Sequence, residues 1–143
     1  MEGKMNDLNN LNSSNLESQL MSYAVSEVYL ERLMKDIKPE WLINESHNAL
    51  FEILSEYYLT SGKMPNKEII SLKLRQQFEE KEANKTFMIY SSLLNHKNDL
   101  HDNQYTISKN AIESHWLENH LKFAMQESMS EIKSKNGKEA LEI

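Results

Sequence analysis

The sequence contains no cysteine, and its 143 residues include only three glycines and two prolines. Without cysteine, neither a disulfide framework nor a thiolate metal site can form, and a reducing compartment such as the cytoplasm is expected. Scarce glycine and proline favour helices joined by short connections. No apolar run approaches the roughly 20 residues of a membrane span, and the first residues lack the basic start and apolar run of a signal peptide. We therefore expect one soluble, cytoplasmic, all-α domain.

Positive charge is also scarce. The formal net charge is −6, and Arg32 and Arg75 are the only arginines. Nucleic-acid binding draws most of its affinity from clustered Lys and Arg against phosphate. The composition therefore predicts little direct DNA binding and favours proteins as partners.

The first half of the chain predicts short helices. Residues 1–13 are polar and asparagine-rich, which predicts a disordered tail. A capping box formed by Ser14 and Glu17 predicts where a globular head, expected over residues 14–104, begins. Ser26 is the expected cap of a second helix. Apolar residues at helical spacing predict the buried faces of these two helices: Leu16, Leu20, Tyr23 or Ala24, then Leu30, Leu33, Met34 and Ile37.

A central helix is predicted between Asn44, a good N-cap, and Gly62, which can adopt the left-handed conformation that ends a helix. Pro65 then prevents an immediate restart. Trp41 and Leu42, in a turn that begins at Pro39, are expected to cover the core. The predicted buried face of the central helix comprises Ala49, Leu50, Ile53, Leu54 and Tyr57, with Phe51 and Tyr58 at its side.

Two more helices should follow. Asn66 is the expected cap of a fourth helix, which Phe78 ends, and 79–85 is expected to be a charged, solvated linker. A fifth, short helix is expected to bury Phe87, Tyr90, Leu93 and Leu94, and 95–103 is expected to be a polar loop.

The last long helix, expected over 105–132, carries more apolar surface than one core face requires. One stripe comprises Tyr105, Ile112, Trp116 and Phe123, a second comprises Leu117, Leu121, Ala124, Met125 and Ile132, and the polar side includes Ser108, His115 and Lys122. We expect one stripe to face its own domain and the other to meet a second helix or subunit. Asn136-Gly137 predicts a turn, so 105–143 is expected to be a helical hairpin whose second arm is truncated.

Histidines are the main candidates for chemistry. His115 and His120 are five positions apart, whereas paired helical zinc ligands lie four apart. His96, Asp99, His101 and Asp102 could ligate a metal, although a solvated polar loop is the simpler interpretation. His47 is expected to cap or pack rather than act as a base. No nucleotide-binding or hydrolase motif is present, so neither a catalytic residue nor a cofactor or metal site is expected in this chain.

In the order of these motifs the chain resembles the N-terminal domain of DnaB-type replicative DNA helicases. The similar segments are residues 16–21 (LESQLM), 39–42 (PEWL), His47 with Leu50 and Phe51, 61–65 (SGKMP) and 90–94 (YSSLL). The family's Gly-Gly before the fifth helix is replaced by EEKEANKT, and its arginine-rich hairpin helix by ESHWLENHLK. A divergent, phage-encoded member would have such departures.

The resemblance implies a non-catalytic collar domain that helps a helicase ring assemble, as a dimer or hexamer, and that docks primase or a loader. ATP and magnesium would then belong to a motor domain beyond Ile143. Under this interpretation the self-association residues are Trp116, Leu117, Leu121, Phe123, Ala124 and Met125, although core packing would explain each as well. The alternatives are the helicase-binding domain of a primase, or a free-standing regulatory protein that binds a helicase. A metal enzyme built on residues 96–102 is the least favoured.

Overall fold

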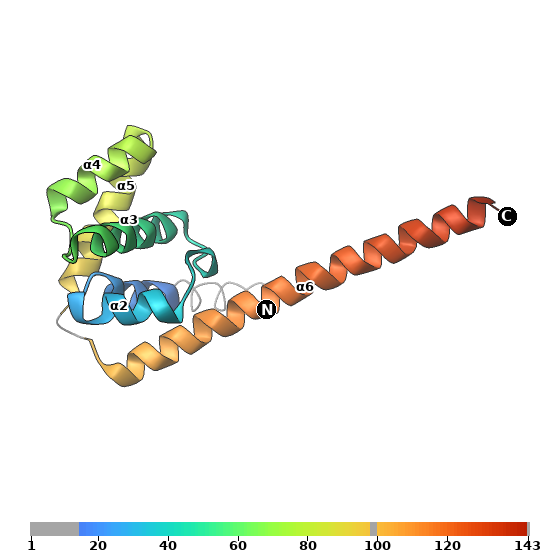
Figure 1. Ribbon diagram of the computed structural model, residues 1–143, viewed down its shortest axis with the longest axis horizontal. Coiled ribbons are helices and arrows are strands. Elements are labelled where there is room, and N and C mark those ends of the chain that lie inside the picture. Colours follow the sequence, from blue (N-terminus) through green and yellow to red (C-terminus); the bar gives the residue numbers. More distant parts are fainter. Residues whose placement is uncertain (1–14, 98–99, 143) are drawn as a thin grey trace, which may run out of the picture. The chain divides into compact units, whose positions relative to one another are not determined.

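The structure, a computed structural model, describes residues 15–97 and 100–142, with side chains up to Ile132. Every regular element in these ranges is helical, as the composition predicts (Figure 1). None of the described helices combines the length and the apolar content that a membrane crossing requires. The tail predicted over 1–13, and the proposed cap Ser14, lie outside the described residues.

The first two helices form one wall of the core. The first helix covers residues 15–24, and α2 spans Glu27–Asp36. The first helix buries nearly its whole circumference, including Leu20 and Tyr23, whereas α2 buries one face through Leu30 and Leu33. Ser26 occupies the N-cap of α2 as predicted, but its side chain makes no capping hydrogen bond.

The 3₁₀ turn η1 (Pro39–Trp41) leads into the central helix α3 (Glu45–Ser61). The Asn44 side chain accepts hydrogen bonds from the backbone N–H groups of Ser46 and His47, which confirms the predicted cap. At the other end Gly62 has φ of 71°, the left-handed conformation that a residue with a side chain rarely adopts. The predicted buried face is confirmed from Ala49 to Leu54.

Helix α4 (Lys67–Gln77) is capped by Asn66 and ends before Phe78, as predicted. The predicted linker 79–85 is wrong, because α5 (Glu80–Asn95) begins there and buries Ala83 and Thr86. The charged residues occupy the exposed sides of the first turns, so a solvated charge run and a helix are compatible. In Figure 1, α3 lies between α2 and α4, and both α3 and α4 pack against α5.

The last helix, α6 (Asp102–Glu142), begins earlier and ends later than predicted. The turn predicted at Asn136-Gly137 is wrong, because α6 continues through both residues, so no second arm begins there. An interior Asn or Gly costs a helix about 1 kcal/mol or less, which is too little to end it. The chain divides into two compact units after Ile112, within α6, rather than after residue 104.

The start of α6 belongs to the first unit. Tyr105, Ser108 and Ile112 share one side of the helix and are all buried, with Tyr105 and Ser108 fully so. The prediction that Ser108 lies on a polar side is therefore wrong: at the i, i+3, i+7 spacing it lies between two core residues. Its hydroxyl has no hydrogen-bond partner among the described residues.

Candidate functional site

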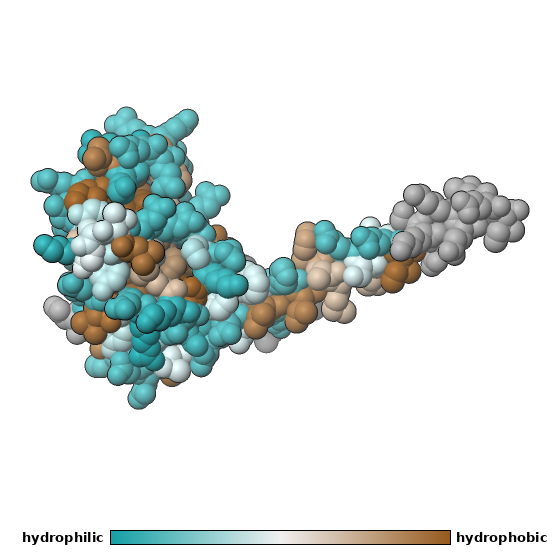
Figure 2. Space-filling view, viewed as in Figure 1, coloured by the Kyte–Doolittle hydropathy of each residue, from teal (hydrophilic) through white to brown (hydrophobic). Residues whose placement is uncertain are grey.

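The second unit carries an exposed apolar surface on α6, within the range whose side chains are described, Glu113 to Ile132. Its exposed large hydrophobic side chains are Leu117, Leu121, Phe123, Met125, Met129 and Ile132, of which the least exposed retains 46% of its accessible area. Figure 2 shows hydrophobic side chains along this helix. Single exposed apolar residues are common on protein surfaces, but a long contiguous set is typical of an interaction site.

The predicted self-association residues fall on two sides of α6. At 100° per residue, Leu117, Leu121, Ala124 and Met125 lie within about a third of the circumference. Met129 and Ile132 extend the same side, and we call this set, from Leu117 to Ile132, the α6 apolar face. Ala124 is exposed with it.

Trp116 and Phe123 lie on another side of the helix, seven positions apart. Trp116 is half-buried, and its ring stacks on that of His120 with centroids 4.8 Å apart and planes 11° from parallel. Phe123 is 60% exposed. The structure therefore does not bring Trp116 and Phe123 together with the α6 apolar face.

Sequence reasoning missed Met129. Its position, four after Met125 and three before Ile132, is the spacing that assigns a residue to the same face. Burying a Leu or Met side chain against a partner contributes about 1.5–3 kcal/mol. The face therefore offers association through apolar burial, and its side chains carry no group suited to catalysis.

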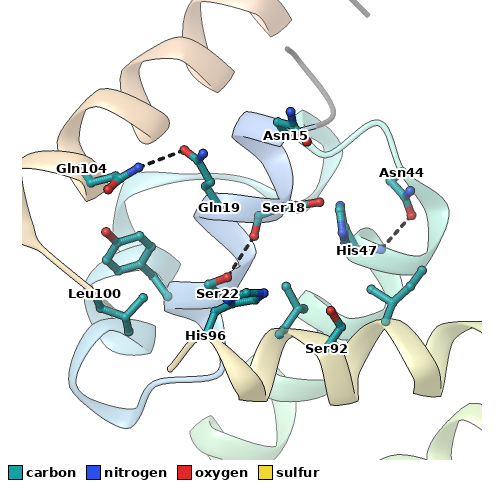
Figure 3. Close-up of a pocket in the computed structure, with 13 residues that line it drawn as sticks. Asn15, Ser18, Gln19, Ser22, Asn44, His47, Ser92, His96, Leu100 and Gln104 are labelled. Carbon is teal, nitrogen blue, oxygen red and sulfur yellow. Dashed lines mark hydrogen bonds between the residues drawn. The ribbon is translucent and has the colours of Figure 1, made fainter. Parts of the chain in front are cut away.

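A separate cavity of about 520 Å³ lies in the first unit, between the first helix, α3 and α5. Ser18 and Ser22 from the first helix, His47 from α3, and Ser92 and His96 from the end of α5 all line it (Figure 3). Its volume is within the range of small-molecule sites.

Two of the lining residues, Asn44 and His47, belong to a buried polar network around Glu17. One carboxylate oxygen accepts from the Ile43 N–H at 3.1 Å, and the other accepts from the Asn44 N–H at 3.0 Å and lies 2.9 Å from His47 Nδ1. Glu17 thus ties the first helix to the start of α3, beyond the capping role predicted for it.

This arrangement orients His47 but does not complete a catalytic pair. The Ser22 hydroxyl donates to the Ser18 carbonyl at 3.2 Å, and no serine within the described ranges hydrogen-bonds to His47. Nucleophilic catalysis requires a nucleophile within hydrogen-bond reach of its base. The expectation that His47 packs is confirmed, since it is 3% exposed.

The residues weighed as alternative metal ligands, His96, Asp99, His101 and Asp102, are not shown to form a site. The Asp102 carboxylate accepts from the Tyr29 hydroxyl at 2.6 Å, and the backbone of His101 pairs with Tyr23. Asp99 lies outside the described residues. No group of three or more His, Asp or Glu side chains suited to a metal ion occurs in the described part of the chain.

An aromatic cluster anchors the beginning of α6. The Tyr105 hydroxyl donates a hydrogen bond to the Asp36 carboxylate at 2.7 Å. The centroid of the Tyr105 ring lies 5.2 Å from that of Tyr23 and 5.6 Å from that of Tyr29. The Arg32 guanidinium lies over the Tyr105 ring, 4.4 Å from its centroid. Burial is the largest cause that raises the pKa of Tyr105, and the hydrogen bond to Asp36 and the negative charge of Asp36 raise it further. The positive charge of Arg32 lowers this pKa and so opposes the shift. The hydrogen bond to Asp102 is the main cause that raises the pKa of Tyr29.

Comparison of the chain with protein-family models, curated proteins and solved structures finds no match.

Proposed function

We propose that this chain is a non-catalytic protein-interaction module that self-associates through the α6 apolar face. The observation that carries the proposal is the exposure of this face, from Leu117 to Ile132, along one side of a long helix. A helix normally buries one apolar stripe, and α6 already buries Tyr105 and Ile112 in the first unit. A second copy of the chain that covers this additional apolar area removes it from water, which stabilises the assembly.

The finer proposal follows from the family resemblance. In that interpretation the module is the N-terminal collar domain of a DnaB-type replicative helicase, and it docks primase or a loader as well as neighbouring copies. Short helices followed by one long helix support this proposal, whereas the continuous α6 departs from the helical hairpin that the resemblance implies. The acidic net charge of −6 suits a domain that contacts proteins rather than DNA phosphates.

Self-association is tested by sedimentation of the full chain beside a double variant, Leu117→Glu/Leu121→Glu. We expect the wild type to form a dimer or larger assembly at about 100 µM, because a pair with a Kd near 1 µM is almost fully formed there. The variant should be monomeric with unchanged helical circular dichroism, since both positions are exposed.

The matched control is Leu72→Glu/Met88→Glu, which places the same charges at exposed apolar positions of α4 and α5. It should associate like the wild type. A monomeric wild type at this concentration would refute the proposal, and so would equal disruption by both double variants. The helicase assignment is tested separately by reading the gene beyond residue 143: a downstream P-loop motor is expected, and a stop codon would favour the free-standing regulator.

A further inference from the structure

Helices α3 and α4 both pack against α5 (Figure 1). A depression is lined by residues of α3 and α4 and of the segments that flank them. It consists of three adjoining hollows of about 360, 260 and 350 Å³. The middle hollow shares Glu52 and Gln77 with the first, and Glu56 and Lys73 with the third. We call this depression the α3–α4 groove.

The groove is long enough for a helix. Along α3 its lining extends from Glu45 to Thr60, a distance of about 22 Å at 1.5 Å per residue. A docked helix of about 15 residues, or four turns, would span it.

Apolar side chains lie among the polar residues that line the groove. Leu42, Ala49 and Ile53 are buried there, at 4%, 4% and 5% exposure. Ile43 stands at one end with 64% of its area exposed, and Leu59 stands at the other with 74% exposed. An amphipathic helix binds such a groove by placing apolar side chains at successive turns into it.

The α3 rim of the groove is acidic. Glu45, Glu52 and Glu56 are exposed and lie at positions i, i+7 and i+11, along one side of α3. None of the three carboxylates has a hydrogen bond or ion pair with a described residue, and Lys73 is the one basic residue among those lining the groove. Unbalanced negative charge beside these apolar side chains favours a partner with the opposite charge pattern.

We propose that the α3–α4 groove docks a basic amphipathic helix of a partner protein. The partner's apolar side chains cover Ile43, Leu59 and the other apolar side chains that line the groove, and its Lys or Arg side chains pair with Glu45, Glu52 and Glu56. Nucleic acid is not the occupant, because its phosphates would be repelled by these carboxylates. The groove lies wholly in the first unit, so the proposal is independent of self-association through α6.

The test uses the full chain and a synthetic 16-residue peptide with Leu at every third or fourth position and Lys elsewhere, labelled for fluorescence anisotropy. Its scrambled isomer has the same composition and charge without an apolar face. We expect the amphipathic peptide to bind, and to shift backbone NMR signals around Glu52 and Gln77. Glu52→Lys/Glu56→Lys should weaken binding about tenfold or more, because it replaces two attractive pairs with repulsive ones.

The matched control is Glu79→Lys/Glu82→Lys, which changes the net charge equally at exposed positions outside the groove. It should change the affinity by about twofold or less, since exposed charges that do not line the groove make no direct pair with the peptide and are screened. Equal weakening by both variants would overturn the proposal, because bulk charge would then explain binding. Equal binding of the scrambled peptide, NMR shifts confined to other surfaces such as the α6 apolar face, or no binding at millimolar peptide would overturn it as well.

Discussion

Tyr105 and Phe123 show how differently one helix can use the same pattern. They are eighteen positions apart, which is five full turns, so both lie on the same side of α6. Tyr105 is fully buried, whereas 60% of the accessible area of Phe123 is exposed. The first helix and α2 supply Tyr23, Asp36 and other contacts for Tyr105. Apolar periodicity thus indicates which side of a helix is to be covered, and the covering group need not belong to the same chain.

The largest effect expected from this comparison is the loss of stability on truncating Tyr105. Tyr105→Ala should lower the free energy of unfolding by about 3–5 kcal/mol, as for other buried aromatic residues. Phe123→Ala is the matched control and should change it by about 0.5 kcal/mol or less. Urea unfolding at low micromolar concentration measures both. Similar losses for the two variants would show that Phe123 is covered within a single chain.

A smaller effect concerns alkaline pH. The folded state raises the pKa of Tyr105 above its usual value near 10. Unfolded tyrosine therefore loses its proton first, and the stabilisation is complete below about pH 10 and lost as pH rises further. Tyr105→Phe should cost about 1.5–3 kcal/mol near pH 8, where it removes a hydrogen bond to a charged group.

The cost of Tyr105→Phe should shrink as pH is raised from 8 to 11, because the wild type alone loses this contribution. Urea unfolding at several pH values gives the two curves. Parallel curves for wild type and variant would exclude Tyr105 as the titrating group.

The smallest effect distinguishes a continuous α6 from the predicted turn. Gly137→Ala should increase helical circular dichroism and slow amide exchange around residue 137, since Ala favours a helix interior by about 1 kcal/mol. In a turn that requires positive φ, the same substitution would be strained. Reduced helicity in Gly137→Ala would restore the hairpin interpretation.

Local features of the fold were predictable, because their causes lie within a few residues. Asn44, Asn66 and Gly62 act at helix ends through neighbouring backbone groups, and all three were predicted correctly. The charged start of α5 was misread because polarity was taken as absence of structure. The spacing of Ala83 and Thr86, which are both buried, was the available signal.

Contacts between distant segments could not be predicted. The Glu17 carboxylate accepts hydrogen bonds from the backbone N–H groups of Ile43 and Asn44 and contacts His47 Nδ1. Nothing in the capping-box pattern around Glu17 indicates these partners. For the candidate site, the periodicity separated Leu117, Leu121, Ala124 and Met125 from Trp116 and Phe123, but the predicted set of self-association residues combined the two stripes. Whether a second copy covers this face depends on a surface that one chain does not contain, and it stays a prediction.

The pairing of Tyr23 with the entrance to α6 has a consequence for synthesis. The Tyr23 hydroxyl donates to the carbonyl of His101 at 2.8 Å and accepts from its N–H at 3.2 Å, across 78 residues. At roughly 5–20 residues per second, the ribosome needs about 4–16 seconds to add those residues. During that interval the first helix can already pack on α3 through Glu17, but Tyr23 lacks its partners at His101 and Tyr105, so nascent chains of this protein should leave the Tyr23 side of the first helix uncovered until α6 begins to appear.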